Sequence, residues 1–483
     1  MDPALIRDLR RALGEDAVIV AREACVAFEC DALSAHRQVP DLVLLPRSVE
    51  QVRQALRLCV AANVPIVTRG AGTGLSGGAK PVAGAALLVM SRLNAILEMD
   101  PRRRIARLQP GVTNLAISQA ARPFGLFYAP DPSSQVACTI GGNVAENSGG
   151  VHCLKYGLTF NNLLQVTFLT LEGEELTLGN EMQETCGLEL LALLCGSEGM
   201  LGIVTEVMVK LLPLPERTEL LLAGFADIER CGAAVSAIIA AGIVPAGLEM
   251  MDAMTLRAAE AFARCDYPLE AGALLLCELD GVSADVDWQL RRVAELLRGL
   301  GATTLRQAAD AAERDRMWSG RKSAFPAVAR LAPDYYCMDG TIPRRRLSEV
   351  LTGIEDLSRR HGLPIANVFH AGDGNLHPLI LFDAGQAGEL QRAERLGAEV
   401  LEMCVAAGGT VTGEHGVGVE KLGPMCAQFN ADELSAFHAV KAAFDPRGLL
   451  NPGKAVPTLA RCADYGALHV HQGRMPHAHL PRF

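Results

Sequence analysis

The stretch "RGAGTGLSGGA" (residues 69–79) follows the apolar run "VPIVT" (64–68) and decides how the first part of the chain is read. Its glycines match the G-x-G-x-x-G spacing, but a Rossmann fingerprint must open a helix. Here Pro81, Gly84 and the apolar run "ALLVM" (86–90) follow instead. Consecutive glycines after a strand let backbone N–H groups converge on an anion. The stretch therefore predicts a pyrophosphate nest outside a Rossmann fold.

Two further blocks are also rich in glycine, "DPSSQVACTIGGNVAENSGGVHCLKYGLT" (131–159) and "GSEGMLGIVT" (196–205). Their glycines allow a close approach of the backbone to a ligand, and short hydrogen-bonding side chains accompany them. Neither block contains a nucleophile elbow or a Walker lysine. Three glycine-rich turns at strand ends predict one large cofactor lying across them.

The composition excludes several classes of protein. The 483 residues are enough for two or three domains. A formal charge of −10 with dispersed arginines excludes a nucleic-acid surface. The 14 cysteines include no C-x-x-C pair, which excludes zinc ribbons and an iron–sulfur relay within the chain. No apolar run reaches the length of a membrane span and no signal-peptide core is found, so we expect a cytoplasmic protein.

The organisation changes at the prolines 213 and 215, where we place a boundary. Beyond them, "LLLAGF", a helix over 227–241 and "VPAGLEMM" form one strand–helix–strand unit. "GALLLCEL", a helix over 284–299 and "ATTLRQ" form a second unit of similar length. Two such units predict a ferredoxin-like layer of split βαβ type.

A second short stretch, "NVFHAGDGNLHPLILF" (367–382), predicts a hairpin, because Asp-Gly between apolar runs is a strong turn signal. With Asp373 and Gly374 as a two-residue loop, His370 faces His377 directly on one face of the sheet. Directly opposed Cβ atoms lie roughly 5 Å apart, which suits two ligands of one ion. A pair of histidines packed without a metal remains the alternative.

These blocks, together with "PRSVEQVRQAL" (46–56), resemble the FAD-binding domain of the vanillyl-alcohol oxidase/p-cresol methylhydroxylase superfamily. "HAGDGNLHP", "GEHGVG" (413–418) and "FDPRGLLNPGK" (444–454) resemble its D-2-hydroxy-acid dehydrogenase branch. "GRKSAFPAVARLAPDYYCMDGTIPR" (320–344) narrows the resemblance to FAD-linked subunits of bacterial glycolate oxidases. The resemblance implies an α+β fold with a two-subdomain FAD-binding domain and a ferredoxin-like substrate (cap) domain. We expect an N-terminal helical segment at 1–37, the FAD-binding domain at 38–215, the cap domain at 216–443 and a returning segment at 444–483.

The resemblance also implies which residues contact FAD. No histidine is present in the first glycine stretch, where relatives with covalent FAD carry one, so we expect non-covalent FAD. The expected contacts are Arg69, Gly70, Ala71, Gly72, Thr73, Gly74, Leu75, Ser76, Gly77, Pro130, Asp131, Ser133, Ser134, Thr139, Gly141, Gly142, Asn143, Ile203, Asn451 and Lys454.

The hydroxy-acid branch implies a divalent metal held by His370, His377 and Glu414. This ligand set suits zinc, manganese, cobalt or iron, and the spacing does not choose among them. His415 is adjacent to Glu414, and we expect it to act as the general base, with a purely structural histidine as the alternative. Arg321 matches the arginine that binds the substrate carboxylate in the family. We expect metal-assisted deprotonation and hydride transfer to the flavin, with glycolate oxidised to glyoxylate. The alternative is a D-lactate or other D-2-hydroxy-acid dehydrogenase that acts without partner subunits.

The resemblance implies an iron–sulfur subunit and a second FAD-domain subunit as partners, docked at the inner face of the plasma membrane. Two other functions compete with this interpretation. A metal-dependent hydrolase could use the two histidines and the glutamate, but it leaves the glycine-rich turns unexplained. A flavin subunit that serves only assembly or electron relay needs no substrate site.

Overall fold

A computed structural model describes residues 1–183 and 187–458, and the chain divides into two compact units. The first unit comprises Met1–Gly149, Leu158–Leu214 and the chain from Glu414 onward. The second comprises Gly150–Gly157 and Pro215–Gly413. Among the described residues, no helix is both long and apolar enough to cross a membrane.

The first unit contains a four-stranded sheet in the order β1-β2-β4-β3. Strands β2, β4 and β3 run parallel. Helix α3 joins β2 to β3, and these two strands lie on either side of β4. The N-terminal helix α1 packs on α3 and on the sheet, so it belongs to this core instead of forming a separate segment. The elements are α1 (Pro3–Leu13), β1 (Val18–Ile19), β2 (Leu42–Leu44), α3 (Val49–Ala61), β3 (Ile66–Arg69) and β4 (Ala86–Val89).

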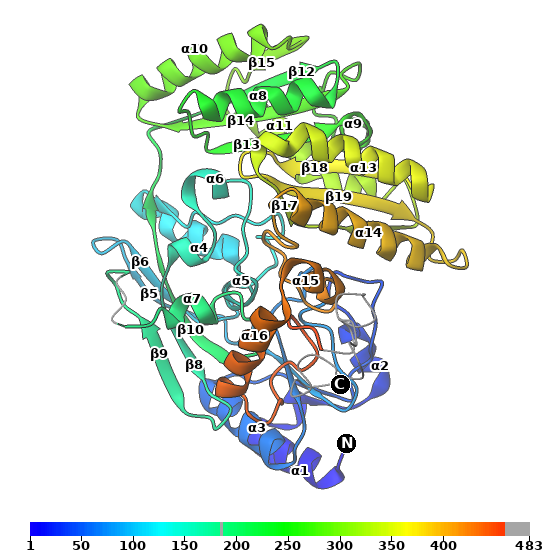
Figure 1. Ribbon diagram of the computed structural model, residues 1–483. Helices are drawn as coiled ribbons and strands as arrows, with labels where there is room; N and C mark the ends of the chain where they lie inside the picture. Colours follow the sequence, from blue (N-terminus) through cyan, green and yellow to red (C-terminus); the bar gives the residue numbers. More distant parts are fainter. Residues whose placement is uncertain (184–186, 459–483) are drawn as a thin grey trace. The chain divides into compact units, whose positions relative to one another are not determined.

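A second sheet of the first unit is antiparallel, with the order β5-β6-β10-β8-β9. Its buried face packs against α4, α5, α7 and the C-terminal helix α16 (Figure 1). The elements are β5 (Ile96–Asp100), β6 (Ile105–Leu108), α4 (Asn114–Ala121), α5 (Ile140–Glu146), β8 (Leu163–Leu169), β9 (Glu175–Gly179), α7 (Leu190–Leu194), β10 (Ile203–Lys210) and α16 (Ala431–Phe444).

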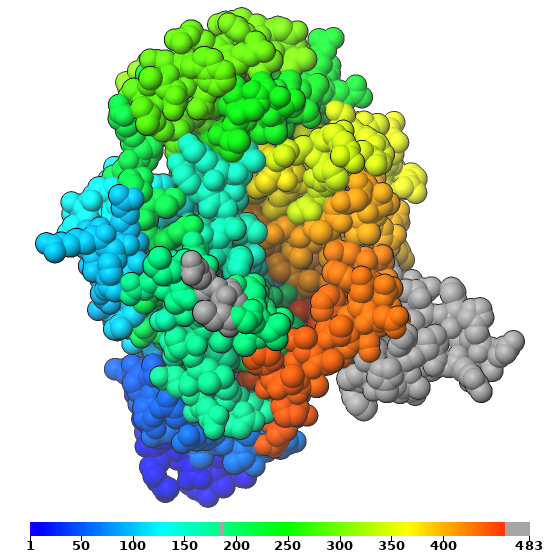
Figure 2. Space-filling model, turned by 60° about the vertical axis from the view of Figure 1, so that its left-hand side comes forward, coloured from blue at the N-terminus to red at the C-terminus, as the bar shows by residue number. Residues whose placement is uncertain are grey.

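The chain returns to the first unit at Glu414, earlier than the sequence-based boundary at residue 444. The backbone N–H groups of Val417 and Gly418 donate to the Glu198 carboxylate, and Lys441 of α16 donates to the Met200 carbonyl. Figure 2 shows the orange residues of this returning segment against the green residues near 200. The boundary at residue 444 was predicted from the pattern of glycines and prolines, and that pattern does not indicate these long-range hydrogen bonds. Of the expected segment 444–483, residues after Thr458 lie outside the described residues.

The second unit is built on one antiparallel sheet in the order β15-β12-β14-β13-β18-β19-β16. Its first four strands have the ferredoxin-like order, which confirms the layer predicted from the two strand–helix–strand units. Helices α8, α10, α13 and α14 pack together on the sheet, and α9, α11 and α12 form another group (Figure 1). The strands are β12 (Arg217–Phe225), β13 (Gly247–Asp252), β14 (Ala273–Gly281), β15 (Thr304–Gln307), β16 (Asp334–Cys337), β17 (Gly340–Thr341), β18 (Ile365–His370) and β19 (Asn375–Phe382). The helices are α8 (Ile228–Ala240), α9 (Ala253–Ala263), α10 (Ser283–Gly299), α11 (Ala311–Lys322), α12 (Ala324–Val328), α13 (Leu347–His361) and α14 (Glu389–Ala406).

The predicted histidine hairpin is present as β18 and β19, but its predicted register is wrong. His370 pairs with Asn375, and His377 pairs with Val368. The turn has four residues, 371–374, because the N–H of Gly374 (φ +84°) donates to the His370 carbonyl at 3.1 Å. Since Asn375 and His377 are two residues apart, the two histidines still share a face as diagonal neighbours. Their ring centroids are 5.0 Å apart.

The turn can be tested by comparing two glycine substitutions in the second unit. A Cβ on Gly374 would lie 2.2 Å from the Ile342 carbonyl oxygen, whereas a Cβ on Gly362 (φ +64°) would meet nothing within 4 Å. We expect Gly362→Ala to cost about 1 kcal/mol of stability, through its left-handed backbone alone. Gly374→Ala should cost clearly more, as measured by the denaturant midpoint of the FAD-loaded protein. Equal losses would show that the turn is not held against Ile342.

Candidate functional site

The first glycine-rich loop of the first unit offers a row of backbone donors. Among the described residues, no protein group accepts a hydrogen bond from the backbone N–H of any residue from 70 to 78. Ser76 is fully buried, and its Oγ has no hydrogen-bond partner. Buried N–H groups normally find an acceptor. The loop therefore fits the diphosphate of a dinucleotide cofactor, as the glycine spacing predicted.

Two residues of the returning segment, Asn451 and Lys454, bind carbonyl groups at the end of this loop. Asn451 Nδ2 donates to the Gly78 carbonyl at 2.9 Å and to the Glu198 carbonyl at 2.6 Å. Lys454 Nζ donates to the carbonyls of Gly78 and Lys80 at 2.9 and 2.8 Å. Burial lowers the pKa of Lys454 to about 8. Asn451 and Lys454, which we expected near the flavin, thus fix the carbonyl side of the loop.

The second glycine-rich block lies directly against the first. Thr139 Oγ1 caps α5 by accepting from Gly142 N, and a Cβ on Gly70 would lie 2.3 Å from that oxygen. Asn114 Nδ2 donates to the Pro130 carbonyl and to Asn143 Oδ1, so the residue before the block is connected to α5. Two further residues expected to contact FAD lie near these loops. Ile203 is buried at the start of β10. Arg69, at the end of β3, donates from Nη1 to the Cys30 carbonyl. Asp131, Ser133 and Ser134 lie in the loop before α5.

Two acids near this loop were not singled out from the sequence. Glu198 is 4% exposed and accepts from Val417 N and Gly418 N at 2.7 and 2.8 Å. The Oε2 atom of Glu146 is buried without a partner, and a Cβ on Gly416 would lie 2.0 Å from it. Burial and then the Glu198 charge raise the pKa of Glu146 well above its ordinary value. Acids inside glycine-rich turns were the signal that could have identified both residues.

In the second unit, one carboxylate connects two of the predicted site residues. Glu249 Oε2 accepts from Arg321 Nε at 2.8 Å, and Glu249 Oε1 lies 2.8 Å from His370 Nδ1. Glu249 and Arg321 are each 1% exposed. Burial alone would raise the pKa of Glu249, but the His370 and Arg321 charges outweigh it and hold the pKa below its ordinary value. A single acid within the apolar strand "VPAGLEMM" was the sequence signal for this residue.

The second histidine has its own orienting groups. His377 Nδ1 lies 3.4 Å from the Met338 carbonyl oxygen and 3.9 Å from Asp339 Oδ1. In both histidines Nδ1 therefore faces an oxygen, which leaves Nε2 as the nitrogen oriented to bind a metal. Asp373 of the hairpin turn accepts a hydrogen bond from Asn375 N at 3.1 Å. Two imidazoles with fixed tautomers fit a divalent transition metal.

Glu414 and His415 follow the point where the chain leaves the second unit. Gly413, its last residue, donates its N–H to the Asp339 carbonyl oxygen at 2.9 Å. Glu414 and His415 belong to the first unit, where His415 Nε2 lies 3.9 Å from Glu414 Oε1. Asp339 also lies near His377. The expected third ligand Glu414 and the expected base His415 therefore follow directly in sequence after a residue that is bonded to Asp339.

Comparisons with known proteins identify the matching families. Residues 40–179 match the FAD binding domain, and residues 214–455 match the C-terminal domain of FAD linked oxidases. The chain is 61% identical to the glycolate oxidase subunit GlcD of Escherichia coli K12, over 95% of this chain and 92% of that protein. It is 30% identical to a D-lactate dehydrogenase of Anaerostipes hadrus, over 90% and 94% of the two chains. Among solved structures, p-cresol methylhydroxylase with bound substrate has a TM-score of 0.81 at 19% identity, over 94% and 96% of the two chains. This likeness confirms the predicted fold class.

The buried Glu146 predicts a pH-dependent stability. Because its folded-state pKa is raised, the folded protein holds this proton more tightly than the unfolded chain does. Stability is therefore lost as pH rises above the ordinary carboxyl value of 4.5. Glu146→Gln should be increasingly more stable than the wild type between about pH 5 and pH 8, and similar to it in more acidic solution.

Thermal unfolding of the FAD-loaded proteins across this range measures the difference. Glu50→Gln is the control, because a hydrogen bond from Arg53 lowers the pKa of the exposed Glu50. That variant should show the opposite and smaller trend. A stability difference for Glu146→Gln that does not change with pH would contradict the raised pKa.

Proposed function

The chain belongs to the FAD-linked oxidases, and from this membership we propose that it uses its FAD to oxidise glycolate to glyoxylate. The glycolate oxidase subunits among its relatives support this substrate, and the D-lactate dehydrogenase is the more distant relative. The structural observation that carries the proposal is the histidine pair oriented by Glu249, Met338 and Asp339. It provides two ligands for an ion on the same sheet face as the Arg321–Glu249 pair.

Each residue of the proposed site has a separate task. His370, His377 and Glu414 would hold a divalent ion, and His415 would take the hydroxyl proton of the substrate. When bound, the ion lowers the pKa of that hydroxyl, and FAD accepts the hydride from the carbon that bears it. Arg321 would bind the substrate carboxylate. Because its Nε and Nη2 face Glu249, the Nη1 edge of the guanidinium would meet the substrate.

The remaining parts of the proposal concern the cofactor linkage and the partners. FAD would be held without a covalent bond, because residues 69–79 contain no histidine. Electrons would leave through an iron–sulfur subunit and a second FAD-domain subunit at the inner face of the plasma membrane, with this chain in the cytoplasm. Relatives named as subunits support an assembly of this kind. A D-lactate dehydrogenase that acts alone is the second candidate, favoured by the relative of that name.

Steady-state rates with an artificial dye acceptor test the substrate. We expect kcat/KM to be highest for glycolate in a panel of glycolate, D-lactate, L-lactate and D-2-hydroxyglutarate. Arg321→Lys keeps the charge but loses the planar guanidinium, so kcat/KM should fall at least about tenfold with unchanged flavin content. A clear preference for D-lactate would favour the second candidate. Wild-type kinetics in Arg321→Lys would remove this residue from the substrate site.

The metal site is tested by His377→Ala, with His361→Ala as the matched control. His361 belongs to the same unit, but it pairs with Glu399 at 2.9 Å, away from the hairpin. We expect His377→Ala to lose its bound divalent metal and to slow by several orders of magnitude, because a single histidine and a carboxylate hold an ion weakly. His361→Ala should keep both properties. Elemental analysis and flavin absorbance measure metal and FAD, and wild-type metal in His377→Ala would refute the ligand assignment.

A further inference from the structure

A pocket of about 620 Å³ lies within the second unit, between the end of α8 and the 3₁₀ turn η6 (Arg344–Arg346). Its wall is largely apolar and includes Ile239, Ala240, Ile342 and Pro343. None of the residues assigned to flavin, metal or substrate lines it. The volume lies within the range of small-molecule sites in proteins.

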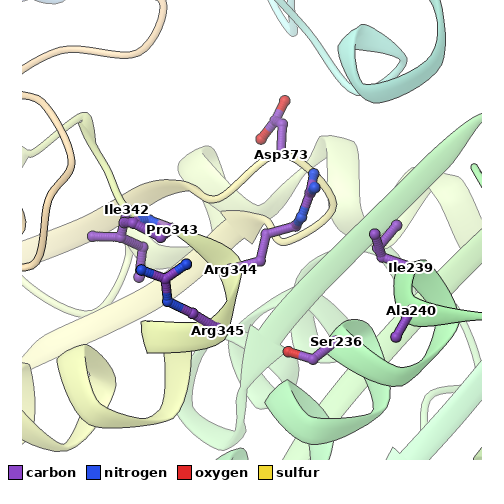
Figure 3. Close-up of a pocket in the computed structure, with 8 residues that line it drawn as sticks. All are labelled: Ser236, Ile239, Ala240, Ile342, Pro343, Arg344, Arg345 and Asp373. Carbon is purple, nitrogen blue, oxygen red and sulfur yellow. The ribbon is translucent and has the colours of Figure 1, made fainter.

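The charged residues that line the pocket are Arg344, Arg345 and Asp373. Figure 3 shows Arg344 rising toward Asp373, while Arg345 extends to the other side beside Ile342. Arg344 Nη1 donates to the Gly372 carbonyl at 2.9 Å, and Arg346 is paired with Glu349. Arg345 is exposed to solvent, and within the part of the chain that the structure describes its side chain has no hydrogen bond or ion pair. The lining residues include two arginines and one aspartate, so the pocket has an excess of one positive charge, and Arg345 is available to a ligand.

We propose that this pocket binds an aliphatic monocarboxylate, with the carboxylate on Arg345 and the hydrocarbon chain on Ile239, Ala240 and Pro343. One uncompensated guanidinium matches one carboxylate. A phosphate or a dicarboxylate would bring a second negative charge near Asp373 and would leave the apolar wall uncovered. The site is separate from the proposed oxidation, so the two proposals stand or fall independently.

Contacts lead from the pocket to the histidine hairpin. Besides the bond from Arg344 to Gly372, the Ile342 N–H donates to the Gly374 carbonyl at 2.9 Å. Gly372 and Gly374 belong to the four-residue turn between His370 and Asn375. A ligand that covers Ile342 and neutralises Arg345 restrains η6 and, through these two bonds, the turn. An occupied pocket therefore reduces local opening at the hairpin.

The experiment uses the FAD-loaded protein and sodium hexanoate as the probe. Calorimetric titration is done in excess oxalate, which occupies other carboxylate-binding groups but is too polar for the apolar wall. We expect one hexanoate per chain, bound at least about tenfold more tightly than acetate, because each buried methylene tightens binding severalfold. Arg345→Gln should weaken hexanoate at least about tenfold. Arg291→Gln removes an exposed arginine of α10 without altering the pocket, and it should bind as the wild type does.

Hydrogen exchange of the peptide covering residues 365–382 reports the coupling. Hexanoate should slow its exchange in the wild type and in Arg291→Gln, but not in Arg345→Gln at the same concentration. Three results would overturn the proposal: hexanoate bound equally well by Arg345→Gln, hexanoate and acetate bound with equal affinity, or inorganic phosphate bound more tightly than hexanoate. Unchanged hairpin exchange at saturation would overturn the coupling.

Discussion

The buried Glu249 carboxylate is the interaction on which the candidate site of the second unit depends. It lies on β13 directly across from His370 on β18, so the strand register places it against the imidazole. Its other oxygen binds Arg321. Removing one partner of a buried charged pair typically costs 3–5 kcal/mol, because the other charge is left uncompensated. The same contacts therefore stabilise the unit and fix two of the side chains proposed to act in the reaction.

The same principle extends along the sheet. Glu278 on β14 accepts from Trp318 Nε1 at 2.5 Å, and Glu249 on β13 accepts from Arg321. Trp318 and Arg321 are three residues apart on α11, so they project from one face of that helix. Two neighbouring strands thus anchor one helix by buried hydrogen bonds to carboxylates. Arg321 is held in place by its helix as well as by its own side-chain partner.

Sequence reasoning succeeded where the signal is local. The two strand–helix–strand units and the presence of a hairpin near residue 373 reflect backbone geometry that nearby residues determine. It failed where distant segments decide. Glu249 is 121 positions from His370, and only the β13–β18 pairing brings them together. The observed hairpin turn is joined to a distant segment, because Ile342 N–H donates to the Gly374 carbonyl. The early return at Glu414 is accompanied by bonds from Val417 and Gly418 to Glu198.

The two units offer different kinds of groups to charged ligands. The first offers the backbone N–H groups of residues 70–78, which would meet the diphosphate of FAD in the proposed site. The close packing of Gly70 on Thr139 and of Gly416 on Glu146 shows how little space remains. The second unit uses long side chains fixed by buried acids, which requires strands in a strict register. A Cβ added at Gly70 or Gly416 would therefore collide with Thr139 or Glu146 in the first unit. In the second unit, a substitution of Glu249 on the neighbouring strand β13 can misplace His370, because it removes the carboxylate that faces the imidazole.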